Sequence, residues 1–70
     1  MSEKLKTLWS QLAGYERALA DCIRQVRNGE PASNPGDEPP THAKIARLIR
    51  EVGEVHVSLL AAEAEEAAAV

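Results

Sequence analysis

The sequence predicts an all-α fold: two helices form an antiparallel hairpin, which pairs with a second copy as a four-helix bundle. All four prolines lie in one segment, residues 29–41, between two stretches rich in Ala, Leu, Arg and Glu. Both stretches repeat apolar residues at heptad spacing. The 70-residue chain has one cysteine and cannot form an internal disulfide, so association is the remaining way to stabilise so small a core.

The first helix is predicted over residues 3–28. Ser2 is a suitable N-cap, and Gly29 suits the position after the helix ends. Its apolar residues follow the a and d positions of a heptad, the seam of a left-handed helix pair. The predicted seam of the first helix consists of Leu5, Leu8, Leu12, Tyr15, Leu19, Cys22 and Val26.

Residues 29–41 are predicted to form a loop. The segment NPGD, residues 34–37, has Pro and Gly where a type II turn prefers them, and Thr41 is a suitable N-cap for the next helix. Loops between antiparallel helices usually need only about 2–8 residues. The excess length leaves two alternatives, a solvated spacer or a recognition loop.

The second helix is predicted over residues 42–66, followed by an Ala-rich tail, residues 67–70, that frays. It completes a single helical-hairpin domain spanning residues 1–70. The heptad spacing of its apolar residues matches that of the first helix. The predicted seam of the second helix consists of Ile45, Leu48, Val52, Val55, Leu59 and Ala62.

Beside the seam, each helix carries a second apolar stripe. In the second helix it consists of Ala46, Ile49, Gly53, Val57, Leu60 and Ala64. In the first helix it is shorter and interrupted by Glu16; it consists of Trp9, Ala13, Ala20 and Ile23. A two-helix hairpin buries only one stripe per helix. The remainder is therefore expected to meet another chain, which is either a second copy or a different protein.

Charge is distributed unevenly along the predicted hairpin. Lys44, Arg47 and Arg50 near the start of the second helix, and Glu63, Glu65 and Glu66 near its end, oppose the helix dipole. Arg24 and Arg27 end the first helix beside the same loop. Three explanations remain open: complementary pairing between antiparallel protomers, a basic patch that binds an acidic partner or phosphates, or simple solvation of the charges. The candidate partner-binding residues at this end are Arg24, Arg27, Lys44 and Arg47.

Residues 50–60, REVGEVHVSLL, contain the one group of carboxylates whose spacing suggests metal binding. Its EVGEV segment resembles the helical Glu-x-x-Glu of MazG-like nucleotide pyrophosphohydrolases, a resemblance that implies magnesium held by Glu51 and Glu54. The second acidic set that those enzymes need has no match in EAEE, and a Glu-x-x-His pair with His56 is absent. We expect solvated carboxylates that form salt bridges with Arg47 and Arg50, no catalytic residues, no metal site and no cofactor.

The bulk composition narrows the class of protein. No signal peptide or membrane-spanning segment is expected, so we expect a cytoplasmic protein. In size, helix count and composition the chain is similar to small phage-encoded host-takeover proteins of the anti-quorum-sensing type. That resemblance implies a module that binds and inhibits another protein, such as a bacterial transcription regulator in the host. The alternatives are an RNA- or DNA-binding hairpin dimer, which the net charge of −3 disfavours, and a magnesium-dependent nucleotide hydrolase.

Overall fold

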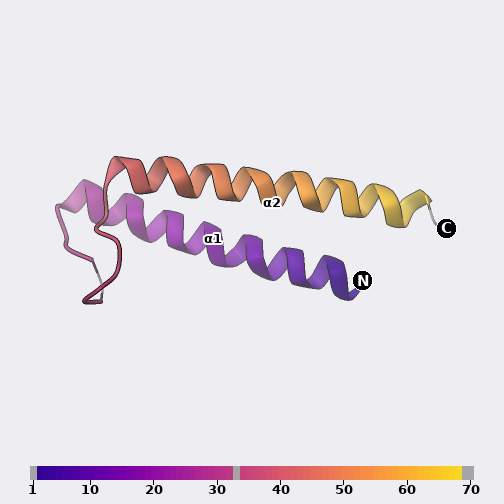
Figure 1. Cartoon of the computed structure of the whole chain (residues 1–70), viewed down its shortest axis with the longest axis horizontal. Helices are drawn as coiled ribbons and strands as arrows, with labels where there is room; N and C mark the ends of the chain where they lie inside the picture. The colour runs from indigo at the N-terminus through magenta and orange to yellow at the C-terminus, as the bar shows by residue number, and fades with distance from the viewer. Residues whose placement is uncertain (1, 33, 69–70) are drawn as a thin grey trace.

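The computed structural model describes residues 2–32 and 34–68, which form an antiparallel pair of helices joined by a long loop (Figure 1). Helix α1 spans Glu3–Asn28 and helix α2 spans His42–Ala68. The molecule is a rod of 50 × 18 × 17 Å. The predicted all-α hairpin is thus confirmed.

Helix α2 ends two residues later than the predicted boundary at residue 66. Its last residues are mainly Ala and Glu, which are strong helix formers, so the helix continues to Ala68. The helix thus extends two residues beyond the predicted boundary, into the tail that is expected to fray. Residues 69–70 lie outside the described part of the chain.

Both ends of α1 are capped as the sequence predicts. The Ser2 side-chain oxygen accepts a hydrogen bond from the Leu5 backbone N–H at 3.2 Å. At the other end Gly29 adopts the left-handed conformation, with φ 69°. The Gly29 N–H donates to the Val26 carbonyl at 3.3 Å, and the Glu30 N–H donates to the Gln25 carbonyl at 2.8 Å. This pair of bonds is a Schellman motif, which satisfies carbonyls that the helix end leaves unpaired.

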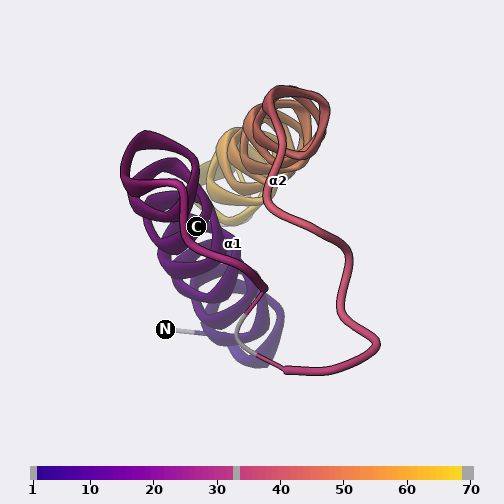
Figure 2. The same cartoon turned by 90° about the vertical axis from the view of Figure 1, so that its left-hand side faces the viewer.

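The loop contains the predicted turn. Gly36 has φ 91°, and the Asp37 N–H donates to the Asn34 carbonyl at 3.2 Å, as in a type II turn. Thr41 then caps α2 by accepting from the Lys44 N–H at 3.1 Å. Viewed from the loop end, the loop bulges to one side of the two helices instead of crossing directly between them (Figure 2).

The core is the predicted seam. Leu12, Val55 and Leu59 form a buried cluster, against which half-buried seam residues such as Tyr15 and Val52 pack. Cys22, 1% exposed, is a free thiol buried in the seam near the loop end. All thirteen predicted seam residues are buried or half-buried where the two helices meet.

Candidate protein-binding site

The hairpin has two chemically different sides. In antiparallel helices, the residues that follow seam positions lie on one side of the pair in both helices, and the residues that precede them lie on the other. The Lys4 ammonium lies 3.2 Å from the Glu65 carboxylate on the side formed by the residues that precede seam positions. We call it the polar side; it carries Lys4, Gln11, Ala18, Gln25, Lys44, Glu51, Ser58 and Glu65.

The opposite side carries the second apolar stripes of both helices, and we call it the apolar face. Trp9 and Ile23 of α1 are 45% and 42% exposed, and Ile49, Val57 and Leu60 of α2 are 55%, 68% and 68% exposed. These five are the large hydrophobic side chains that remain exposed among the described residues. Trp9, Ile23, Ile49 and Leu60 each follow a seam residue and lie on the apolar face, whereas Val57 lies beside it on the outer surface of α2. A patch of exposed hydrophobic side chains of this kind is typical of a protein-binding surface.

The two helices come together at one groove on the apolar face. It has a volume of about 240 Å³ and is lined by Trp9, His56, Leu59, Leu60 and Glu63. Trp9 from α1 and Leu60 from α2 form its apolar walls, and Glu63 adds a charge. Trp is enriched among the residues that dominate binding energy at interfaces, which makes Trp9 the candidate anchor.

Gly53 lies in the middle of the α2 stripe. A Cβ atom added to Gly53 would meet no atom within 4 Å, so nothing in the hairpin requires glycine there. Glycine inside a helix costs about 1 kcal/mol relative to alanine. Any close packing against Gly53 must therefore come from another molecule.

At the loop end, two of the basic side chains are paired with carboxylates of the same chain. Arg24 lies 3.9 Å from the Glu30 carboxylate. Arg47 pairs with Glu38 and also with Glu51, at 3.7 Å. Loop and helix carboxylates thus neutralise two of the four cations proposed for partner binding, which weakens this end as an anion-binding surface.

Lys44, a third of those cations, is half-buried and ties the loop to the polar side of the hairpin. Its ammonium donates to the Glu38 carbonyl at 3.2 Å. The hollow between loop and helices, of about 250 Å³, is lined by Ala18, Asp21, Gln25, Ala32, Asp37 and Lys44. The loop therefore rests on the polar side and leaves the apolar face uncovered.

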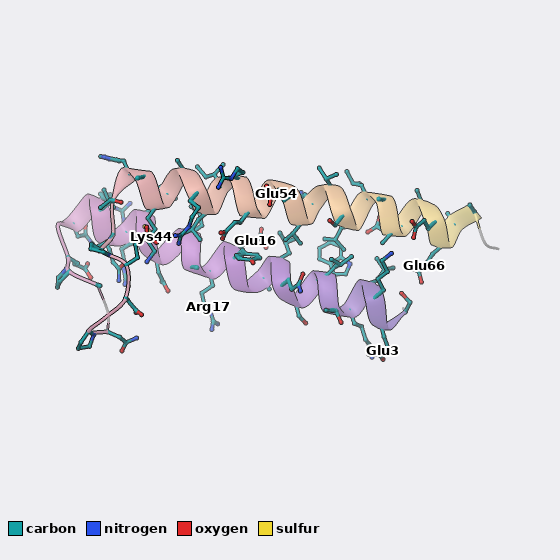
Figure 3. All side chains as sticks on the ribbon, in the orientation of Figure 1. Glu3, Glu16, Arg17, Lys44, Glu54 and Glu66 are labelled. Carbon is teal, nitrogen blue, oxygen red and sulfur yellow. The ribbon has the colours of Figure 1, made fainter. Side chains whose placement is uncertain are left out.

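The carboxylates of residues 50–60 behave as a charged helix surface. Glu51 forms the expected ion pair with Arg47. The ion pair expected for Glu54 is not found among the described residues. Arg17 projects away from α1 in Figure 3, and Arg17 and Glu54 are both exposed. Within residues 2–32 and 34–68, no three His, Cys, Asp or Glu side chains are grouped so as to hold a metal ion.

Two polar residues, one buried and one half-buried, were not predicted from the sequence. Gln25, which precedes a seam residue, is 6% exposed. Glu66 occupies the next heptad position after Leu59 and is half-buried near the end of α2 (Figure 3). Its Oε2 atom is buried without a hydrogen-bond partner in the described part of the chain. Extending the heptad by one more step would have identified Glu66, but no sequence signal marks Gln25.

Comparison with known proteins finds no matching family model, no similar curated protein and no similar solved structure. Neither of the two described helices has an apolar stretch long enough to cross a bilayer.

Proposed function

We propose that this protein is a small interaction module that binds another protein through the apolar face and modulates its activity, most simply by inhibition. The observation that carries the proposal is the presence of four large exposed hydrophobic side chains on one uncovered face, with Val57 exposed beside them: Trp9, Ile23, Ile49 and Leu60. Their exposure leaves apolar surface in water, and covering that surface is the driving force for association.

The surroundings of these residues also fit an interface. Charged groups such as Glu16, Arg50 and Glu63 border the apolar side chains, and interfaces typically combine an apolar centre with a polar rim. Homodimerisation into a four-helix bundle belongs to the same proposal, because it would cover the same surface in the absence of a partner.

The partner class follows from the resemblance in layout to small phage inhibitors. A bacterial transcription regulator is the first partner to test, with inhibition of its DNA binding as the functional consequence. Nucleic acid is the weaker candidate, because Arg24 and Arg47 are paired with carboxylates and the net charge is −3.

The test compares two neighbouring substitutions that add the same charge. Leu60→Glu places a carboxylate on the apolar face, whereas Ala61→Glu, the matched control, places it at an exposed position away from that face. Wild-type protein and both variants serve as baits in a bacterial lysate, and captured proteins are quantified by mass spectrometry.

We expect at least one protein to be captured equally by wild type and Ala61→Glu, and about 30-fold less by Leu60→Glu, corresponding to the ~2 kcal/mol of a strong interface residue. If the purified captured protein is a regulator, adding wild type should reduce its binding to operator DNA and Leu60→Glu should not. Identical captured sets for all three baits would contradict the proposal.

A further inference from the structure

We propose that the partner segment bound by the apolar face is a basic amphipathic helix. One of its apolar side chains packs on Trp9, and two of its cations, about 15 Å apart, pair with Glu63 and Glu16. This inference rests on the proposed function, because it names the chemistry of the partner for the same surface.

The groove at Trp9 contains the first of the two carboxylates. Trp9, Leu60 and Glu63 line this groove together, and Trp9 is 45% exposed. An apolar side chain that enters the groove contacts Trp9 and Leu60. A cation about one helical turn further along the partner, roughly 5 Å away, then meets Glu63. The groove therefore combines an apolar contact with a negative charge at its edge.

Glu16 is the second carboxylate, one heptad after Trp9 in α1. In antiparallel helices, one heptad forward in α1 lies at the level of one heptad backward in α2. Trp9 has His56 and Glu63 on the α2 side of its groove. Glu16 therefore has Ile49 and His56 on its α2 side. This places Glu16 between the apolar residues of the face, about 15 Å along the rod from Glu63.

Neither carboxylate has a charged partner within the described chain. The ion pairs of residues 2–32 and 34–68 lie at the loop end and, for Lys4 and Glu65, on the polar side. Glu16 and Glu63 are both exposed and belong to none of them. A purely apolar partner would remove water from these carboxylates without replacing it, which costs free energy. A partner with cations at matching positions avoids this cost.

The shape and charge of the face together favour a basic helix over other occupants. The apolar residues run from Trp9 to Ile23, fourteen residues or about 21 Å, which four turns of a partner helix would cover. A second copy of the chain would bring its own Glu16 and Glu63 to the same surface, and like charges oppose each other. The basic helix is therefore the tighter occupant and displaces a second copy.

The test uses synthetic helical peptides as probes. Three labelled peptides share one stripe of Leu residues and differ at two positions about eleven residues apart, which carry Arg, Gln or Glu. Fluorescence anisotropy measures their binding to wild type, to Glu63→Lys and to Glu54→Lys, at low and high salt. Glu54→Lys is the matched control: it makes the same charge change at an exposed residue that precedes a seam position and so lies away from the apolar face.

We expect wild type to bind the Arg peptide about tenfold more tightly than the Gln peptide, and the Glu peptide least tightly. High salt should reduce this preference. Glu63→Lys should bind the Arg peptide about fivefold more weakly than wild type does, and the Glu peptide more tightly. Glu54→Lys should keep the wild-type order. Equal binding of the three peptides to wild type, no binding of the Arg peptide at millimolar concentration, or an equal change in both variants would overturn the inference.

Failure of this inference is distinguishable from failure of the proposed function. A captured protein that is lost by the Leu60→Glu bait but binds Glu63→Lys and Glu54→Lys baits equally would overturn the basic helix and leave the proposed function standing. Peptides that show the expected preference, together with lysate baits that all capture identical protein sets, would support the inference and contradict the proposed function.

Discussion

The two sides of the hairpin differ in what covers them. On the polar side, the Lys4–Glu65 pair bridges the helices at one end, and at the other end the loop rests on α2 through Glu38 and its contacts with Lys44 and Arg47. The apolar face has no such cover, and its large side chains are exposed to solvent. Polar contacts within the chain lie at both ends of the polar side, whereas the apolar face presents exposed hydrophobic side chains to a molecule outside the chain.

This difference indicates how so small a chain can be stable. A single seam between two helices gives a thin core, in which the buried hydrophobic residues of the described chain are Leu12, Cys22, Leu48, Val55, Leu59 and Ala62. Domains of this size usually need help from disulfides, metals or association. Association through the uncovered apolar face would provide this additional stability.

The largest effect should come from the seam, which both sides share. Leu12→Asp buries an unpaired charge at a residue that is 3% exposed, so we expect a loss of about 4 kcal/mol and an unfolded chain. Circular dichroism and thermal melting provide the measurement. Gln11→Asp, on the exposed polar side, is the control and should retain the helicity. A cooperative melt of Leu12→Asp near the wild-type temperature would show that the seam is misassigned.

The second-largest effect is expected from a substitution on the apolar face. Leu60→Glu should weaken the dimer by about 2 kcal/mol, roughly 30-fold in dissociation constant, since the carboxylate loses water on association. Ala61→Glu should leave dimerisation unchanged. Sedimentation equilibrium measures both constants. If both substitutions weakened the dimer equally, the apolar face would be no more important for dimerisation than the polar side.

A smaller effect, an increase in stability, is expected at Glu66, where the seam of α2 ends. Glu66→Leu removes the buried carboxylate oxygen that lacks a hydrogen-bond partner in the described chain, and should raise the free energy of unfolding by about 1 kcal/mol. Glu65→Leu breaks only the exposed pair with Lys4, so its effect should lie within about 0.5 kcal/mol. Chemical denaturation of both variants compares them. Destabilisation by Glu66→Leu would mean that its carboxylate has a favourable role.

The smallest effect should come from the loop on the polar side. Replacing residues 31–38 with a short Gly/Ser segment removes the exposed Arg47–Glu38 pair, and loop length changes closure entropy only slowly. We therefore expect unchanged helicity and dimer mass, and stability within about 1 kcal/mol of wild type. Loss of partner capture by the refolded variant would identify the loop as a recognition element.

The fold was largely predictable because its signals are local. Proline positions, heptad spacing and the capping residues Ser2, Gly29 and Thr41 each depend on a few neighbouring residues, and the structure confirms them. Helix α2 ends two residues beyond the predicted boundary, because helix propensity continues through the Ala-rich segment. The surplus stripes were also visible in the sequence, since they repeat at helical spacing.

The candidate site was predicted less completely. The loop contacts of Arg47 and Lys44 depend on how residues 29–41 fold back, which no local pattern specifies. The burial of Gln25 likewise follows from the loop resting on the polar side. That Trp9 and Leu60 line one groove required the antiparallel pairing, which brings the two stripes to the same face.

Trp9 offers the most direct test that the apolar face is covered by another protein chain. It is the only tryptophan and lies on that face, 45% exposed in the single hairpin, so its fluorescence reports whether the face is covered. We expect a blue-shifted emission at high protein concentration that shifts to the red on dilution, as a dimer of twice 7.6 kDa separates into monomers. A red emission that is identical at every concentration would contradict self-association through this face.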